Sequence, residues 1–451
     1  MIKQTFLAVL QWGCCIKRAN FWNILKVRDF SIFTFAQTVS QFGDKLDYIA
    51  LVAIIGLFPK EQAPLLLSQM MIFITLPVLI FGPIAGILVD RWHKKTVMVI
   101  CDALRTVCAI MIPILFLATR SIYPVFAAVF FMFLLALFFN AARSAIIPNL
   151  VSRERILTAN SVVNFVSRGA TFMGMLVGGI IVDWQIWHKA FGIAGWTAAF
   201  ILDSVTFAVS AFLLYIMKVR LPEIPKKVEH LKPRGFFMLL KGGLSKMWHE
   251  LVYALKMIVR EKNLAFVMAT IVLMVIAGSA IYILVIPTVQ QEMAWGTSGV
   301  GFLAAIGAIG LLLGAYLTGI FGHHFDMKIL MLASFIIIGG ALLLFPILNS
   351  FLVFALVCFV CGTAISPVFI GQDTLIHHYA DELVRGRIFS IRDWILNGLF
   401  AIGAALVGFL SAVINKDYLF VIFGICVASL ATLGWLILAR GKSNSVSQSH
   451  T

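Results

Sequence analysis

The sequence predicts an all-α integral membrane protein with twelve transmembrane helices and both termini in the cytoplasm. The first observation is composition: of 451 residues, 61% are hydrophobic and 12% are charged, whereas a soluble protein carries about 25% charged residues. The second is a series of continuous apolar runs, each long enough to cross a bilayer at about 20 residues per helix. The third is the position of the basic residues between these runs.

The N-terminal segment 1–29 is predicted to be a cytoplasmic interfacial tail. Its apolar stretch, Phe6 to Ile16, is too short to span a membrane and is followed at once by Lys17 and Arg18. A small-residue cleavage site is absent, so we interpret the stretch as an interfacial helix rather than a signal peptide. The first true span is then expected to act as an uncleaved insertion signal.

The apolar runs divide into two sets of six. The predicted spans cover about 30–57, 65–89, 96–118, 121–142, 158–182 and 191–217, and then 264–289, 298–322, 328–348, 351–372, 391–413 and 418–439. We therefore predict an N-terminal six-helix bundle over 30–217 and a C-terminal six-helix bundle over 263–440. A 6+6 division also suggests an internal repeat.

The segments outside the bundles are polar or basic. The basic cytoplasmic linker 218–262 joins the two sets, and its second half is amphipathic enough to lie on the inner leaflet, with a solvated linker as the alternative. The tail 441–451 is polar and is predicted to be disordered.

The positive charge predicts the orientation. The chain has 35 Lys and Arg and a net charge of +15. With both ends in the cytoplasm, only Lys60, Arg120, Lys189 and Lys416 fall in loops on the other side, and most of the remainder lie in cytoplasmic segments. This bias is typical of membrane orientation, so we do not expect a nucleic-acid partner.

One loop resembles the signature loop of the major facilitator superfamily. It reads Gly86-x-x-x-Asp90-Arg91-x-x-Lys94-Lys95. The resemblance implies the major facilitator fold, two six-helix bundles around a central cavity that works by alternating access. Gly86 is then expected to allow close helix approach, and the charged residues to latch the cytoplasmic side. The alternative is that the basic residues only anchor the chain by the positive-inside rule.

Two further features extend or limit the resemblance. The end of span 8, from Gly319 to Lys328, repeats the glycine-to-lysine spacing, but His323 stands where the first copy has an acid. In span 5, Met175 stands where many antiporters of the superfamily have proline, within Gly174-x-x-x-Gly178-Gly179. Helix packing through the glycines is expected to survive this change, whereas a proline kink is not.

Other segments resemble the branch of the superfamily that contains macrolide-efflux proteins and the enterobactin exporter. They are Gln37-x-x-Ser40-Gln41-x-Gly43-Asp44, Asp102-x-x-Arg105, Ala142-Arg143 through Leu150, and Arg385-Gly386-Arg387. The resemblance implies secondary transport. We assign Arg143, Arg385 and Arg387, with the signature loop, to cytoplasmic gating.

The first span has one polar face. At about 100° per residue, its polar side chains from Gln37 to Tyr48 fall within an arc about 160° wide, centred on Asp44. A charge in lipid costs at least about 2.5 kcal/mol, so this face must meet protein or a wet cavity. We predict Asp44, with Gln37 and Gln41, as a substrate- or proton-binding site; the alternative is a structural salt bridge. Lys45 and Asp47 are expected to neutralise each other or to lie near the outer interface.

Two more charged residues join the predicted site. Arg168 in span 5 is expected to pair with Asp44 or to bind an anionic group, with snorkelling to the interface as the alternative. Asp203 in span 6 is a secondary candidate. Asp102 and Arg105 are three residues apart on one helix face, and a local ion pair accounts for them.

The leading functional hypothesis is proton-coupled export of a bulky amphiphile, such as a macrolide-like drug or a siderophore, by a monomer in a bacterial inner membrane. Alternatives are a lysophospholipid flippase, a siderophore importer, or a non-transporting scaffold. The sequence has no nucleophile–base arrangement, phosphate loop or metal cluster, so we expect neither an enzyme nor a cofactor.

Overall fold

The computed structural model describes residues 24–89, 91–219, 252–253, 255–348, 350–380 and 382–448, and the regular secondary structure within these residues is helical. Helices are expected here because a backbone in lipid has no water to bind, and a helix satisfies all of its backbone hydrogen bonds within one segment. The predicted interfacial stretch, Asp90 and most of the linker 218–262 lie outside the described residues.

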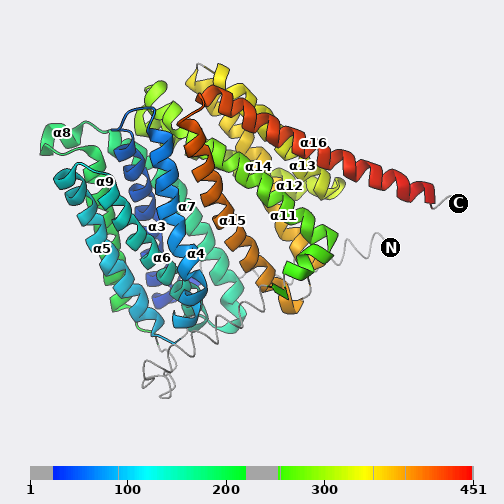
Figure 1. Ribbon diagram of the computed structural model, residues 1–451. Helices are drawn as coiled ribbons and strands as arrows, with labels where there is room; N and C mark the ends of the chain where they lie inside the picture. Colours follow the sequence, from blue (N-terminus) through cyan, green and yellow to red (C-terminus); the bar gives the residue numbers. More distant parts are fainter. Residues whose placement is uncertain are drawn as a thin grey trace.

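The N-terminal half consists of six long helices (Figure 1). They are α3 (Arg28–Ile55), α4 (Ala63–Val89), α5 (Lys94–Thr119), α6 (Tyr123–Leu150), α7 (Ile156–Asp183) and α9 (Gly195–Ile216), with the short α8 (Ile186–Phe191) before α9. Helix α3 packs against α7 and α9, and α5 packs against α6 and α9. The polar face of α3 is thereby turned toward protein.

The C-terminal half also consists of six long helical segments. The first, α11 (Lys262–Ala280), continues through two π-helical turns, η3 (Ile281–Val285) and η4 (Thr288–Glu292). The others are α12 (Gly296–Phe321), α13 (Met327–Leu344), α14 (Phe351–Tyr379), α15 (Glu382–Ser411) and α16 (Lys416–Gln448). Helix α12 packs along α14, and α13 packs along α16.

Eleven of these helical segments are long and apolar enough to cross a membrane. Helix α3 has 28 residues, as many as α6 and α7, but it carries five charged residues between Arg28 and Asp47 and is not one of the eleven. Large apolar side chains such as Phe212 and Ile402 are exposed on the outside of the molecule. The chain is therefore a multi-pass membrane protein.

The predicted spans agree with the helices to within a few residues, except that several helices are longer. Helix α6 continues to Leu150, α14 continues to Tyr379, and α15 already begins at Glu382. Apolar runs mark only the part of a helix in hydrocarbon, so polar extensions beyond it were not predicted. Helix α16 likewise continues to Gln448, where the sequence favoured a disordered tail.

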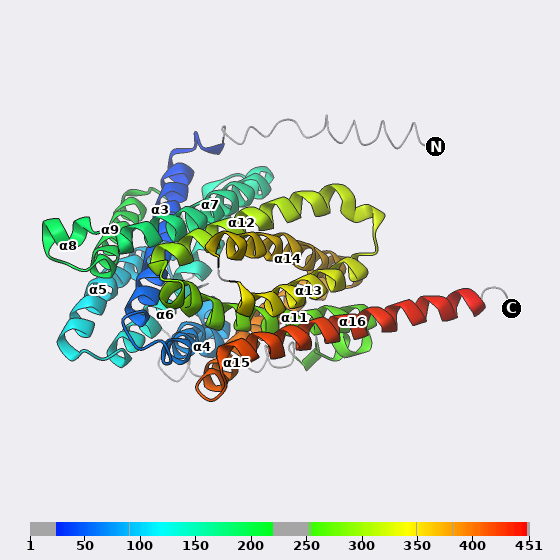
Figure 2. The ribbon, with the colours of Figure 1, turned by 90° about the horizontal axis from the view of Figure 1, so that it is seen from above.

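The two halves meet at one end of the molecule. The end of the molecule that holds Arg28 and Lys94 is called the basic end. The halves meet at the other end, which is called the opposite end. Helix α7 contacts α12, and α4 contacts α15; Figure 2 shows both pairs between the halves. At the opposite end, a Cβ on Gly179 would lie 3.0 Å from the Cα of Ser298, so the backbones of α7 and α12 touch. The expected glycine packing of span 5 is thus confirmed.

Toward the basic end the halves separate, as Figure 1 shows for α4 and α15. Phe165 of α7 is 71% exposed and Tyr316 of α12 is 66% exposed. A Cβ on Gly86 or on Gly319 would meet no other heavy atom within 4 Å. No helix approaches Gly86 in this conformation, in which the halves lie apart at the basic end, so the expected close helix approach at Gly86 stays a prediction.

Candidate functional site

A buried acidic cluster lies where α3, α5 and α9 meet. We use this name for Asp44, Asp47, Asp102 and Asp203 together with Arg105. Arg105 of α5 is 3% exposed. Its guanidinium forms an ion pair with Asp44 of α3, lies 3.3 Å from Asp102 of its own helix, and stacks over the ring of Phe207 of α9 at 3.9 Å. Arg105 therefore links three helices.

Asp102 is held on both sides. Its Oδ1 faces Arg105, and its Oδ2 accepts a hydrogen bond from Ser210 Oγ of α9 at 2.6 Å. The side chain is completely buried. The predicted local pair of Asp102 and Arg105 is thus present, but Arg105 has a second, interhelical partner that the i,i+3 spacing did not reveal.

Asp47 and Asp203 form a second part of the cluster. Both are buried, and their carboxyl groups lie beside each other across the α3–α9 contact. Thr206 Oγ1 donates to Asp203 Oδ1 at 3.1 Å, whereas Asp47 Oδ1 and Asp203 Oδ2 have no hydrogen-bond partner among the described residues. The expected neutralisation of Asp47 by Lys45 is wrong, because Asp47 is turned toward α9 instead.

Gly43 permits this helix crossing. A Cβ at Gly43 would overlap both Thr206 Oγ1 and Asp203 Oδ1. Any side chain there would push α9 away from α3. The glycine in the motif therefore brings the carboxyl groups of the two helices together.

The two predicted glutamines differ in their surroundings. Gln41 Nε2 donates to Asp44 Oδ2 at 2.9 Å and helps to orient that carboxylate. Gln37 is buried, and neither of its side-chain polar atoms has a hydrogen-bond partner among the described residues. Gln37 is thus buried on α3, the helix that also carries Asp44, but it forms no hydrogen bond with the described residues of the acidic cluster.

The predicted pair of Asp44 and Arg168 does not form, because Asp44 pairs with Arg105. Arg168 is exposed on α7, on the part of the helix that has separated from α12. Arg143 is half-buried on α6, outside the acidic cluster. Neither arginine is brought to Asp44 in this conformation.

Those predicted gating residues of the signature loop that the structure describes lie at the basic end. Lys95 Nζ donates to the backbone oxygen of Tyr215 at 2.7 Å, so it binds within its own half, and Arg91 is half-buried. Asp90 and the side chains of Arg385 and Arg387 lie outside the described residues. Nearby, Arg392 forms ion pairs with Asp373 of α14 and Asp393.

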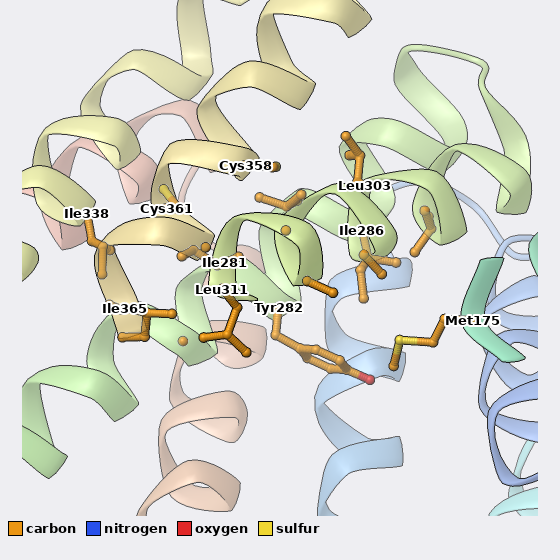
Figure 3. Close-up of a pocket in the computed structure, with 18 of the residues that line it drawn as sticks. Met175, Ile281, Tyr282, Ile286, Leu303, Leu311, Ile338, Cys358, Cys361 and Ile365 are labelled. Atoms are coloured by element: carbon orange, nitrogen blue, oxygen red, sulfur yellow. The ribbon is translucent and has the colours of Figure 1, made fainter. Parts of the chain in front are cut away.

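A cavity of about 720 Å³ lies mainly inside the C-terminal half (Figure 3). Its walls come from α11, η3, α12, α13, α14 and α15, with Tyr48 and Ile49 of α3 and Phe172 and Met175 of α7 closing one side. None of the described residues that line it carries a charged side chain. The polar side chains in its wall are Tyr48, Tyr282, Cys358, Cys361 and Asn397.

Tyr48 joins the acidic cluster to the cavity. It follows Asp47 on α3 and lines the cavity, where its ring centroid lies 6.2 Å from that of Tyr282 on η3. The sequence placed Tyr48 on the polar face of the first span, but it did not reveal the partner from the other half. A change in α3 can therefore reach the cavity through this ring contact.

Two helical halves that touch at one end and separate at the other, with a charged cluster in one half and an apolar cavity in the other, define a membrane transporter. The chain belongs to the Major Facilitator Superfamily: the model of that family matches residues 30–399 and, overlapping, 268–451. The earlier resemblance is thus confirmed. Members of this family bind small molecules in the membrane and are transporters rather than enzymes.

The following two relatives are bacterial proteins. The chain is 22% identical to macrolide efflux protein A of Streptococcus pyogenes, over 92% of this chain and 96% of that protein. It is 25% identical to a protein described as the bacilysin exporter BacE of Bacillus amyloliquefaciens, over 85% and 89%. The crystal structure of the nucleoside transporter NupG superposes with a TM-score of 0.64 at 13% identity, covering 91% of this chain and 98% of that one, which shows the shared fold. Bacterial relatives and membrane-spanning helices fit a protein of the bacterial cell membrane.

Proposed function

We propose that this chain is a proton-coupled secondary transporter that exports a bulky amphiphilic small molecule, such as a macrolide-like drug or a siderophore, by alternating access. In this proposal α3 is the twelfth span, and the basic end faces the cytoplasm by the positive-inside rule. The chain works as a monomer, since each copy encloses its own cavity. The acidic cluster is the observation that carries the proposal.

The charge balance of the cluster supports proton binding. Three of the four carboxyl groups, those of Asp44, Asp102 and Asp203, interact with the single guanidinium of Arg105, and the fourth, that of Asp47, lies against Asp203. If all four ionised, the excess negative charge would be buried within the membrane-spanning part of the protein, where uncompensated charge is strongly unfavourable. Protonation of some of the carboxyl groups removes that excess. Release and uptake of these protons would couple the cluster to a proton gradient.

Asp44 is the carboxyl group best placed for proton exchange. Its side chain is 22% exposed, whereas those of Asp102 and Asp203 are completely buried. Deprotonated Asp44 is held by Arg105; protonation weakens this ion pair and frees α3 from α5. Asp47 and Asp203 then form a second, buried site that binds the proton.

Helix α3 can carry this change to the other half. Gln290 Nε2 donates to the backbone oxygen of Val52 at 3.1 Å, and Gln291 Nε2 donates to the backbone oxygens of Gly56 and Phe58 at 3.0 and 3.1 Å. These hydrogen bonds join the end of α3 to η4. Movement of α3 therefore strains the contact that keeps the opposite end closed.

The exported substrate is inferred from two sources. The relatives named above are efflux proteins for small molecules, and the cavity is apolar and of a size that accommodates drug-like ligands. Separation of the halves at the basic end gives a substrate access from the cytoplasm in the proposed orientation.

The test is proton-driven flux in proteoliposomes with an imposed pH gradient, with a macrolide and a catecholate siderophore as probes. We expect Asp44→Asn to abolish uphill transport while substrate exchange without a gradient continues. Asp417→Asn, which changes an exposed aspartate at the start of α16, is the matched control and keeps wild-type flux. Full gradient-driven flux in Asp44→Asn would refute the proposal, and inward flux of the siderophore would favour an importer.

A further inference from the structure

We infer that the cavity in the C-terminal half binds an uncharged, largely apolar ligand, and that the Tyr282 hydroxyl donates a hydrogen bond to an acceptor on that ligand. The inference rests on the proposed export function and narrows its substrate class. It separates neutral amphiphiles from anionic siderophores, which the sequence left as alternatives.

The walls of the cavity argue for an uncharged ligand. Of the described residues that line it, none carries a charge, and most are aliphatic, aromatic or glycine. Tyr48 has a charged neighbour in Asp47, but that carboxyl group is buried against α9, which contributes no residue to the wall. A charged ligand would lose its hydration here without gaining a partner of opposite charge.

Tyr282 is the polar group aimed into this space. Its hydroxyl is buried and lies beside the hydroxyl of Tyr48, but it makes no hydrogen bond of normal geometry with any of the described residues. Figure 3 shows the side chain extending into the cavity with the hydroxyl toward the side lined by Met175. A buried donor without a partner is unfavourable, and an acceptor on a bound ligand would satisfy it.

The backbone and two rings fix the position of this hydroxyl. Tyr282 lies in the π-helical turn η3, and π-helical turns are rare and frequently mark functional sites. The Tyr282 ring centroid is 6.2 Å from that of Tyr48 and 6.1 Å from that of Phe400, which meets it edge-on. Contacts on both sides hold the ring, so the hydroxyl is preorganised for one direction of approach.

Two native cysteines give a direct readout of occupancy. Cys358 and Cys361 of α14 line the cavity and are free thiols. Cys426 of α16 is also free and half-buried, but it does not line the cavity. Alkylation by N-ethylmaleimide, which is small and uncharged, reports on the cavity at the first two positions and on general access at the third.

The experiment uses the full chain in lipid nanodiscs and three probes that share one ring system. Dansylamide is uncharged, dansylglycine is anionic and dansylcadaverine is cationic. At ten times its Kd, dansylamide should slow alkylation of Cys358 and Cys361 about tenfold, because the fraction of empty sites falls as 1/(1 + [L]/Kd). The two charged probes should leave both rates unchanged, and no probe should change the rate at Cys426.

Variants test the assigned hydrogen bond. Tyr282→Phe should raise the half-protecting concentration of dansylamide about five- to tenfold, as expected for one neutral hydrogen bond. Tyr316→Phe is the matched control, because Tyr316 is exposed on α12 and outside the cavity. An unchanged alkylation rate at Cys426 in each variant shows that the fold is intact.

Several results would overturn the inference. These are equal protection by all three probes, protection by none of them, equal slowing at Cys426, or unchanged protection in Tyr282→Phe. The proposed function is tested separately from the ligand site. If both proposals hold, Asp44→Asn loses gradient-driven flux and keeps dansylamide protection. A wild-type protein without proton-driven flux but with selective protection would refute the transport mechanism and leave the ligand site standing.

Discussion

The backbone N–H of Ser298 donates a hydrogen bond to Asp183 Oδ2 at 2.6 Å, so the last residue of α7 caps the first turn of α12. A residue of the N-terminal half thereby satisfies a helix end in the C-terminal half. A carboxylate at a helix N-terminus is favourable both as a hydrogen-bond acceptor and through the helix dipole. This contact, with those of Gln290 and Gln291, holds the opposite end closed.

The first prediction concerns this cap. Asp183→Ala removes the acceptor, and we expect the closed opposite end to lose about 1 kcal/mol, the usual effect of deleting a cap. Cys358 and Cys361 should then react faster with a membrane-impermeant maleimide added on that side. Asp417→Ala, at the same end but away from the contact of α7 with α12, should leave the rates unchanged. Equal rates in both variants would contradict the role of the cap.

The second prediction concerns Gly296, which precedes the capped turn with φ of 61°. A Cβ at this position would lie 2.5 Å from Asp183 Oδ2. Gly296→Ala should therefore destabilise the protein by about 1–2 kcal/mol from the left-handed backbone alone, measured as a lower melting temperature. Gly340→Ala is the control, since a Cβ there meets nothing within 4 Å. An unshifted melting temperature in Gly296→Ala would count against this assignment.

The third prediction concerns Arg105. Arg105→Ala leaves Asp44 and Asp102 without their cation, and loss of one partner of a buried ion pair destabilises by about 3–5 kcal/mol. Adding Asp44→Asn to Arg105→Ala should recover part of this loss, because the second change removes one of the unpaired charges. Thermal unfolding of the four proteins in a double-mutant cycle measures the coupling. Strictly additive effects would show that the two residues do not interact.

The fourth prediction concerns Gly86 at the open basic end. Gly86→Val should leave dansylamide protection of Cys358 unchanged, because a Cβ at this position meets no other heavy atom within 4 Å in the present conformation. Transport should fall, because alternating access requires this end to close and the helices to approach there. Gly340→Val is the matched control, equally unobstructed but within the C-terminal half. Undiminished transport in Gly86→Val would show that the helices do not close at this position.

The helices could be predicted because each apolar run must form its own backbone hydrogen bonds in lipid. The polar face of α3 could be predicted because each residue of a helix is rotated by about 100° from the one before it, which fixes the direction of every side chain around the helix axis. The choice of Arg105 as the partner of Asp44 was not visible. A helical wheel shows where a side chain points on its own helix but not which neighbour lies there, and the nearby Asp102 already offered Arg105 a partner.

Contacts between the halves were harder still to predict. Gln290 and Gln291 bind backbone oxygens, which every residue has, so no motif marks their partners. The Asp183 cap joins residues 115 positions apart and has no local signature. The expected packing at Gly86 came from a loop whose neighbours depend on the conformation. Sequence patterns therefore predicted the helices and their polar faces, but not the residue pairs that join the two halves.

The unusual polarity of α3 has a consequence for the synthesis of the protein. Charged residues make insertion of a helix on its own less favourable, so α3 is expected to be a weaker insertion signal than its apolar run alone suggests, although it is the first long helix to leave the ribosome among those described. Its counter-ion, Arg105, emerges 61 residues after Asp44, and the partner of Asp47, on α9, is translated later again. If α3 is the twelfth span, as proposed, its stable residence in the bilayer awaits α5 and α9, and the N-terminal half is then expected to assemble as a unit rather than helix by helix.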